Sequence, residues 1–129
     1  MIFLLISSFT IAQQQNIIQN QSELSESQIA DIKNSVIVLS EKLINEGYTP
    51  KICRQRANTY FVLKEYGKAI VDFTTIIENK TSDLGEVYYQ RGLNYLLISD
   101  SINACKDFKK SKELGYSIQL ENFELLCGG

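Results

Sequence analysis

The chain of 129 residues contains no histidine and no tryptophan, and it has only one proline, one methionine and three cysteines. Without histidine it cannot form a Ser-His or Cys-His nucleophile pair, and it lacks the commonest protein ligand of transition metals. A Cys-x-x-Cys pair, a glycine-rich phosphate loop and a Gly-x-Ser-x-Gly turn are also absent. The 15 acidic residues follow expected helix caps and outer faces, so no acid and base pair stands out. We therefore expect no enzyme, no catalytic residues, no metal and no cofactor.

Positive charge is also scarce. The formal net charge is -2 and the pI is near 5.2, whereas a nucleic-acid-binding domain normally carries a strongly basic face. A lysine cluster over residues 106–112 is interrupted by an aspartate, which favours a solvated helix face. We expect no nucleic-acid partner.

The N-terminus begins with an apolar run over residues 1–12, followed by three glutamines. The run is too short to cross a bilayer, which needs about 20 residues, and Thr10 with Ala12 offers a small-residue cleavage site. No lysine or arginine precedes it. We predict a signal peptide over 1–12, export to the periplasm or the medium, and no stable membrane insertion after cleavage. The alternative is a cytoplasmic protein in which this segment is a buried strand or helix.

The composition then becomes polar over residues 13–27, which predicts a flexible linker before a folded domain at 28–129. Within that domain a shift of 35 residues superposes seven identical residues. The pairs are Gln55 and Gln90, Arg56 and Arg91, Tyr60 and Tyr95, Ala69 and Ala104, Asp72 and Asp107, Phe73 and Phe108, and Glu78 and Glu113. A period of this length is typical of a helix-turn-helix unit that is stable only when stacked on its neighbours.

Start and stop signals place the helices. They predict a first helix that ends before Gly47, four helices at about 50–63, 66–79, 84–98 and 101–114, and a last one at about 118–127. The expected signals are a capping box of Ser25 with Gln28, an N-cap at Thr49 before Pro50, a cap of Asp83 with Glu86, an N-cap at Asp100 or Ser99, and a left-handed stop at Gly115.

Small residues at Ala57, Gly92, Ala69 and Ala104, with aromatic residues at Tyr60, Tyr95, Phe73 and Phe108, recur in both copies. At these positions, over about 52–116, the chain resembles the tetratricopeptide repeat family. Cys53 replaces the expected aromatic residue or leucine, and the closing proline is Thr81 in one copy and Tyr116 in the other. The resemblance implies an all-α fold of antiparallel helix-turn-helix repeats, at about 50–83 and 85–116, stacked as a short right-handed α-solenoid with capping helices.

Each copy contains an arginine followed 16 residues later by an aspartate on the partner helix. We predict two equivalent structural ion pairs, Arg56 with Asp72 and Arg91 with Asp107, which tie the two helices of each unit together.

Three cysteines leave one unpaired if a disulfide forms. Cys105 lies 10 residues before Gly115 and Cys127 lies 10 residues after Ser117, so two antiparallel helices around this turn would bring them together. We predict a disulfide between Cys105 and Cys127, and Cys53 as a buried core residue. The alternative is three free, buried thiols in a cytosolic protein.

In the family that the chain resembles, the first helix of each unit lines a concave groove. The corresponding residues here are Arg54, Asn58, Phe61 and Val62, then Tyr89, Leu93, Leu96 and Leu97. Arg54 and Asn58 resemble part of a clamp for a peptide carboxylate. The resemblance implies a non-enzymatic module that binds a peptide or helix of another protein. The alternative is a self-associating scaffold, a homo-oligomer or a chain whose groove is filled by its own first helix.

Overall fold

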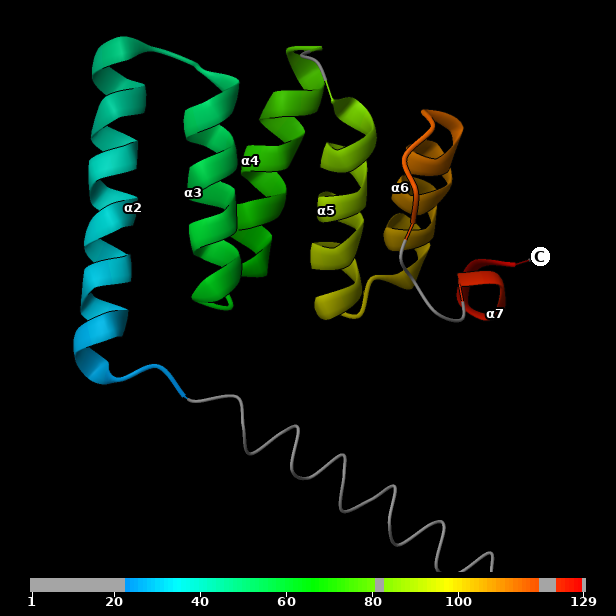
Figure 1. Cartoon of the computed structure of the whole chain (residues 1–129), viewed down its shortest axis with the longest axis horizontal. Helices are drawn as coiled ribbons and strands as arrows, with labels where there is room; N and C mark the ends of the chain where they lie inside the picture. The colour runs from blue at the N-terminus through cyan, green and yellow to red at the C-terminus, as the bar shows by residue number, and fades with distance from the viewer. Residues whose placement is uncertain (1–22, 81–82, 119–122, 129) are drawn as a thin grey trace, which may run out of the picture.

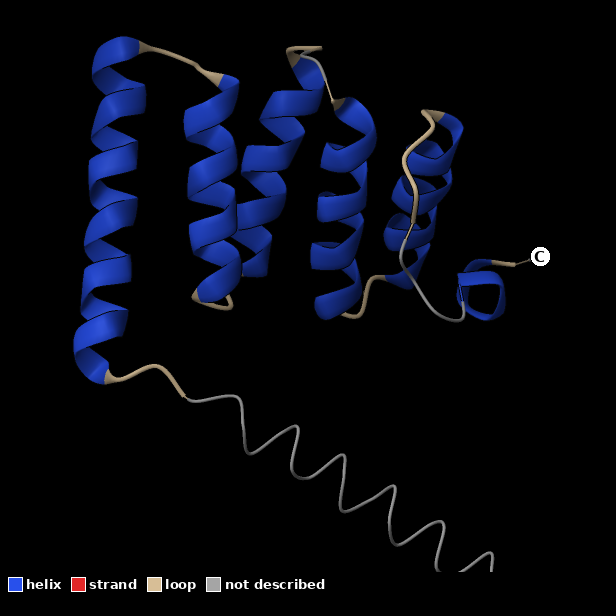
Figure 2. Cartoon of the chain, viewed as in Figure 1, coloured by secondary structure: helices blue, strands red, loops and turns tan. Residues whose placement is uncertain are grey.

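The structure is a computed structural model that describes residues 23–80, 83–118 and 123–128. The predicted signal peptide at 1–12 and the first part of the predicted linker lie outside the described residues. All regular elements in the described ranges are helices, joined mostly by short loops (Figures 1 and 2). They are α2 (Glu26–Glu46), α3 (Pro50–Val62), α4 (Tyr66–Glu78), α5 (Leu84–Leu97), α6 (Ser101–Glu113) and α7 (Phe123–Cys127).

Most helix boundaries follow the predicted capping signals. Ser25 accepts a hydrogen bond from the Gln28 backbone nitrogen at 3.3 Å, and the Gln28 side chain accepts one from the Ser25 nitrogen at 2.8 Å. Thr49 caps α3 ahead of Pro50. Gly47 and Gly115 follow α2 and α6 with φ of 83° and 84°, a region in which side chains larger than hydrogen are strained.

One local prediction is wrong. Asp83 precedes α5 with φ of 63° and makes no side-chain capping hydrogen bond, while Glu86 pairs with Arg54 on α3 instead of completing the cap. For the last helix, predicted at about 118–127, the structure describes α7 from Phe123 to Cys127, and Ile118 lies outside a helix. The residues at 119–122 lie outside the described ranges.

The helices pack side by side in chain order, each against the next, which gives the row seen in Figure 1. The predicted fold class is confirmed: the protein is an all-α helical repeat. This order places α2 at one end of the described stack and α7 at the other, so α2 packs mainly against α3.

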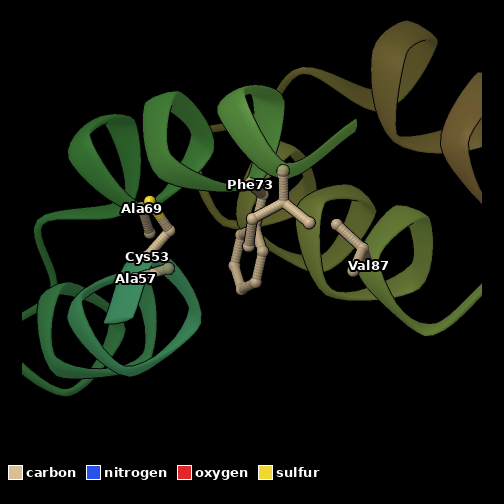
Figure 3. Packing of buried hydrophobic residues seen from close by; sticks show 6 residues of the cluster. Cys53, Ala57, Ala69, Phe73 and Val87 are labelled. Carbon is tan, nitrogen blue, oxygen red and sulfur yellow. The ribbon is translucent and has the colours of Figure 1, made fainter. Parts of the chain in front are cut away.

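The first core cluster joins α3, α4 and α5. Cys53, Ala57 and Ala69 lie together between α3 and α4, and Phe73 reaches towards Val87 on α5 (Figure 3). All five are buried. The alanines let α3 and α4 approach closely, and the phenylalanine fills the space between units. Cys53 is the free, buried core residue that the sequence predicts.

The second core cluster repeats this arrangement between α5, α6 and α7, with Ala104, Phe108 and Cys127 buried at its centre. Gly92 takes the place that Ala57 has in the first unit. A Cβ at Gly92 would lie 2.7 Å from Cε1 of Phe108, so the close approach of α5 and α6 requires glycine here.

Candidate functional site

The conserved spacing of arginine and aspartate in the two copies produces two bidentate ion pairs. In the first unit, Arg56 binds Asp72 through contacts of 2.6 and 2.8 Å. In the second, Arg91 binds Asp107 through two contacts of 2.7 Å. The aspartates are only 2% and 4% exposed. These are the two pairs expected from the sequence, and they bind the two helices of each unit.

Each arginine also donates a third hydrogen bond to the helix of the preceding unit. Nη1 of Arg91 bonds Oγ1 of Thr74 on α4, and Nη1 of Arg56 bonds Oγ of Ser40 on α2, each at 3.1 Å. Hydrogen bonding to Asp72 raises the pKa of Arg56. Burial opposes the charge of Arg91, but the hydrogen bonds and charge of Asp107 outweigh it and raise that pKa. Both arginines are structural.

The contact at Ser40 identifies the place of α2 in the repeat. Ser40 precedes Thr74 by 34 residues, and Leu43 precedes Ile77 by the same distance. The side chains of Leu43 and Ile77 both pack against the first core cluster. Helix α2 therefore takes the place of the second helix of a preceding unit. Sequence reasoning missed this, although the shift of 34 residues was visible.

In the first unit of the predicted groove, Arg54 and Phe61 contact other side chains of the stack. Nη1 of Arg54 lies 2.8 Å from Oε2 of Glu86, so its charge is paired across α3 and α5. Phe61, 40% exposed, packs edge-on against Tyr66 with ring centroids 5.8 Å apart. Arg54 is therefore paired within the stack, and its binding to a peptide carboxylate stays a prediction.

The second-unit residues of the predicted groove lie largely under the chain's own C-terminal segment. Tyr89 packs between Phe108 and Tyr116, with ring centroids at 5.8 and 5.3 Å. Leu93 and Leu96 are half-buried against the cluster that includes Cys127, whereas Leu97 is 49% exposed. The eight predicted residues thus do not share one open surface.

A disulfide between Cys105 and Cys127 holds this C-terminal cover in place, with their Cα atoms 5.4 Å apart. The pairing is the predicted one. Phe123 adds an edge contact to Phe108 at 6.4 Å between ring centroids. The C-terminal end of the stack is therefore closed by α7, which the disulfide bonds to α6.

At the N-terminal end of the stack, the described residues leave a groove open. A groove of about 650 Å³ runs between α2 and α3, and an adjoining hollow adds about 290 Å³. We call both together the α2–α3 groove. Its lining residues are Asp31, Ile32, Asn34, Ser35, Val38, Leu39 and Lys42 on α2, with Gln55, Asn58, Thr59 and Val62 on α3. Asn58 and Val62 are the two predicted groove residues that line it.

The repeat register explains why this groove is open. On α2, Ser35, Val38 and Leu39 correspond to Ala69, Asp72 and Phe73, which are buried on α4 against α3. On α3, Thr59 corresponds to Asn94, which is 1% exposed on α5. Faces that neighbouring helices cover elsewhere in the stack are uncovered here. The α2–α3 groove therefore occupies the position of a missing first helix.

The turn that would introduce such a helix is also absent. In the first unit, residues 63–65 form the tight turn between α3 and α4. Their counterparts at 29–31 lie inside α2, which begins three residues earlier, at Glu26. Glu23, the counterpart of the small residue Ala57, is exposed. A helix that enters this groove cannot be connected to α2 by the short turn found in the other units.

Among the residues with a described position, no group of three His, Cys, Asp or Glu side chains could hold a metal ion. No helix in the described ranges is long and apolar enough to cross a membrane. The comparisons found no family model, no curated protein and no solved structure that matches this chain.

Proposed function

We propose that this protein is a non-enzymatic interaction module of the tetratricopeptide repeat type, which binds a helix of another protein in the α2–α3 groove. The observation that carries this proposal is the uncovered pair of faces on α2 and α3, whose counterparts in the next unit are buried. A helix placed between them would continue the packing pattern of the stack. The apolar wall of Val38, Leu39 and Val62 supplies the hydrophobic contact that helix-in-groove binding needs.

The polar residues of the groove define the chemistry of the ligand. Asp31 and Lys42 lie 11 residues apart on α2, or about 16 Å along the helix at 1.5 Å per residue. A bound helix of about three turns would match this length. Because α2 carries the acidic group near one end and the basic group near the other, we expect a ligand with a basic residue at one end and an acidic residue at the other.

Among the described residues, the α2–α3 groove has no counterpart of the Arg–Asp ion pair that joins the two helices of each unit. Where α4 carries Asp72, α2 carries Val38, and the amide side chain of Asn58 on α3 has no hydrogen-bond partner among the described residues. A ligand with an apolar side chain opposite Val38 is thus favoured over one with an arginine, since an unpaired buried charge is costly.

The test is selection of amphipathic helical peptides from a displayed library on the full chain. Binding of the selected peptides is then measured by fluorescence anisotropy. Val38→Arg, a charge in the half-exposed wall of the groove, should weaken binding at least tenfold. Val71→Arg, at a 63% exposed site on α4, is the matched control and should leave binding unchanged. Selected peptides that bind the Val38→Arg protein as well as the parent would contradict the proposal.

We also propose that the protein is exported. A disulfide that persists in the mature chain is typical of an oxidising compartment, and the Cys105–Cys127 bond supports this. The intact mass of protein isolated from its host under non-reducing conditions should show a new N-terminus near Gln13 and the loss of two hydrogens. A reduced chain that retains Met1 would support the cytoplasmic alternative.

A further inference from the structure

A second apolar surface lies on another side of α2, away from the groove. Ile37 and Ile44 are 56% and 81% exposed, and Ala30 is exposed one heptad earlier. Residues seven apart lie almost on one line along a helix, so these three form a stripe. We call it the α2 stripe. Ile37 and the groove residue Val38 point about 100° apart at 3.6 residues per turn, so the stripe leaves the groove accessible.

The α2 stripe is peculiar to α2. The positions of Ile44 in the other two second helices carry Glu78 and Glu113. The position of Ile37 carries Lys106 on α6 and the exposed Val71 on α4. Neither α4 nor α6 therefore carries exposed apolar residues at both positions, because a glutamate replaces Ile44 in each. The apolar residues on α2 need a different explanation, because exposed apolar residues aligned along one helix are characteristic of a packing surface.

The stripe is complementary to itself. Suppose that two α2 helices pack antiparallel about a two-fold axis at Ile37. A residue a given number of positions before Ile37 in one copy then faces the residue the same number of positions after Ile37 in the other copy. Small Ala30 then faces large Ile44 of the second copy, and Ile37 faces its own equivalent. Alternation of small and large side chains across an interface allows close packing.

The charges beside the stripe match under the same symmetry. Lys33 lies four residues before Ile37 and Glu41 lies four residues after it, so Lys33 of each copy faces Glu41 of the other. Both side chains are exposed, and neither has an ion-pair partner within the described part of the chain. Two Lys33–Glu41 pairs would therefore flank the apolar centre and disfavour a parallel arrangement, in which like charges meet.

We propose that the protein forms a homodimer through antiparallel packing of the α2 stripe of one copy against that of a second. One helix face on each copy is a small interface, below the ~1,200 Å² of the standard class, so the dimer should dissociate in the micromolar range. This proposal does not depend on the peptide-binding function, because the stripe and the groove are separate surfaces. Peptide binding and dimerisation can therefore fail independently.

The test is sedimentation equilibrium of the full chain over a dilution series. Ile37→Glu should raise the dimer dissociation constant at least a hundredfold, because it places two like charges at the centre, whereas Val71→Glu on α4 should leave it unchanged. Circular dichroism checks that each variant keeps its helix content.

Charge reversal tests the arrangement itself. Lys33→Glu and Glu41→Lys should each weaken the dimer about tenfold, and the double variant should restore it, since the reversed pairs match again. A chain that is monomeric up to ~1 mM would overturn the proposal and assign the stripe to a different protein or to residues 1–22. A dimer that the double variant fails to restore would overturn the antiparallel arrangement.

Discussion

Replacing Arg91 by methionine should be among the most destabilising single changes in this protein. Methionine has a similar length but no charge, so the change removes three hydrogen bonds, two to Asp107 and one to Thr74. Asp107 is only 4% exposed and would remain as a buried carboxylate without its cation. Breaking such a pair typically costs about 3–5 kcal/mol, compared with about 5–15 kcal/mol for the total stability of a small domain.

The assay is urea unfolding followed by circular dichroism. With an m-value of about 1.5 kcal/mol per molar urea, a loss of 3–5 kcal/mol lowers the midpoint by about 2–3 M. Lys110→Met is the control, because its pair with Glu113 is exposed and should contribute no more than about 1 kcal/mol. The double variant Arg91→Met with Asp107→Leu should recover most of the lost stability, since no buried charge is left unpaired.

The reasoning is refuted if Arg91→Met costs no more than the exposed control. It is also refuted if the double variant is as unstable as the single one, because the penalty would then come from lost packing and not from the isolated carboxylate.

Three further predictions concern other parts of the stack. Gly92→Ala should lower the free energy of unfolding by about 1–3 kcal/mol despite its better helix propensity, because the new Cβ would overlap the buried ring of Phe108; thermal unfolding measures this. Replacing Cys105 and Cys127 together by serine should cost about 3 kcal/mol for a 22-residue loop, and a reductant should then have no further effect on the midpoint. Hydrogen bonds from Asn103 depress the pKa of Asp100, so this carboxylate stabilises the fold above its unfolded pKa of about 3.9 and loses that contribution as the pH falls through its folded value. The stability difference between the parent and Asp100→Ala should therefore shrink below about pH 4, and an unchanged difference would show that ionisation is irrelevant to the cap.

Features that the internal repeat encodes twice were predictable. The arginine and aspartate of each unit lie 16 residues apart in both copies, so one geometry had to satisfy both pairs. The disulfide followed from equal distances on either side of a turn. The Arg54–Glu86 pair had no such signal, because the counterparts of these residues are Tyr89 and Lys51. In the sequence, Glu86 matched a capping pattern with Asp83. In the structure it forms an ion pair with Arg54 of the other unit instead.

The α2–α3 groove was only partly predictable. Asn58 and Val62 were placed correctly on the first helix of a unit, but the facing surface belongs to α2. The sequence of α2 resembles that of α4 only at packing positions such as Leu43, so its place in the repeat was not recognised. The expected groove also ignored the C-terminal segment, which covers Tyr89 and its neighbours. When a segment from elsewhere in the chain covers a helix face, the spacing of apolar residues on that helix does not show which segment covers it.

The amino-acid sequence by itself determined the helices, most of their caps, the repeat and the bonds within each unit, because these depend on residues at short or repeated separations. Only the tertiary structure decided which helix faces are covered and which are open. Burial depends on what lies next to a face, and the same kind of face is buried on α4 but open on α2, where the stack ends. The open groove and the α2 stripe exist because no first helix precedes α2 in the described chain.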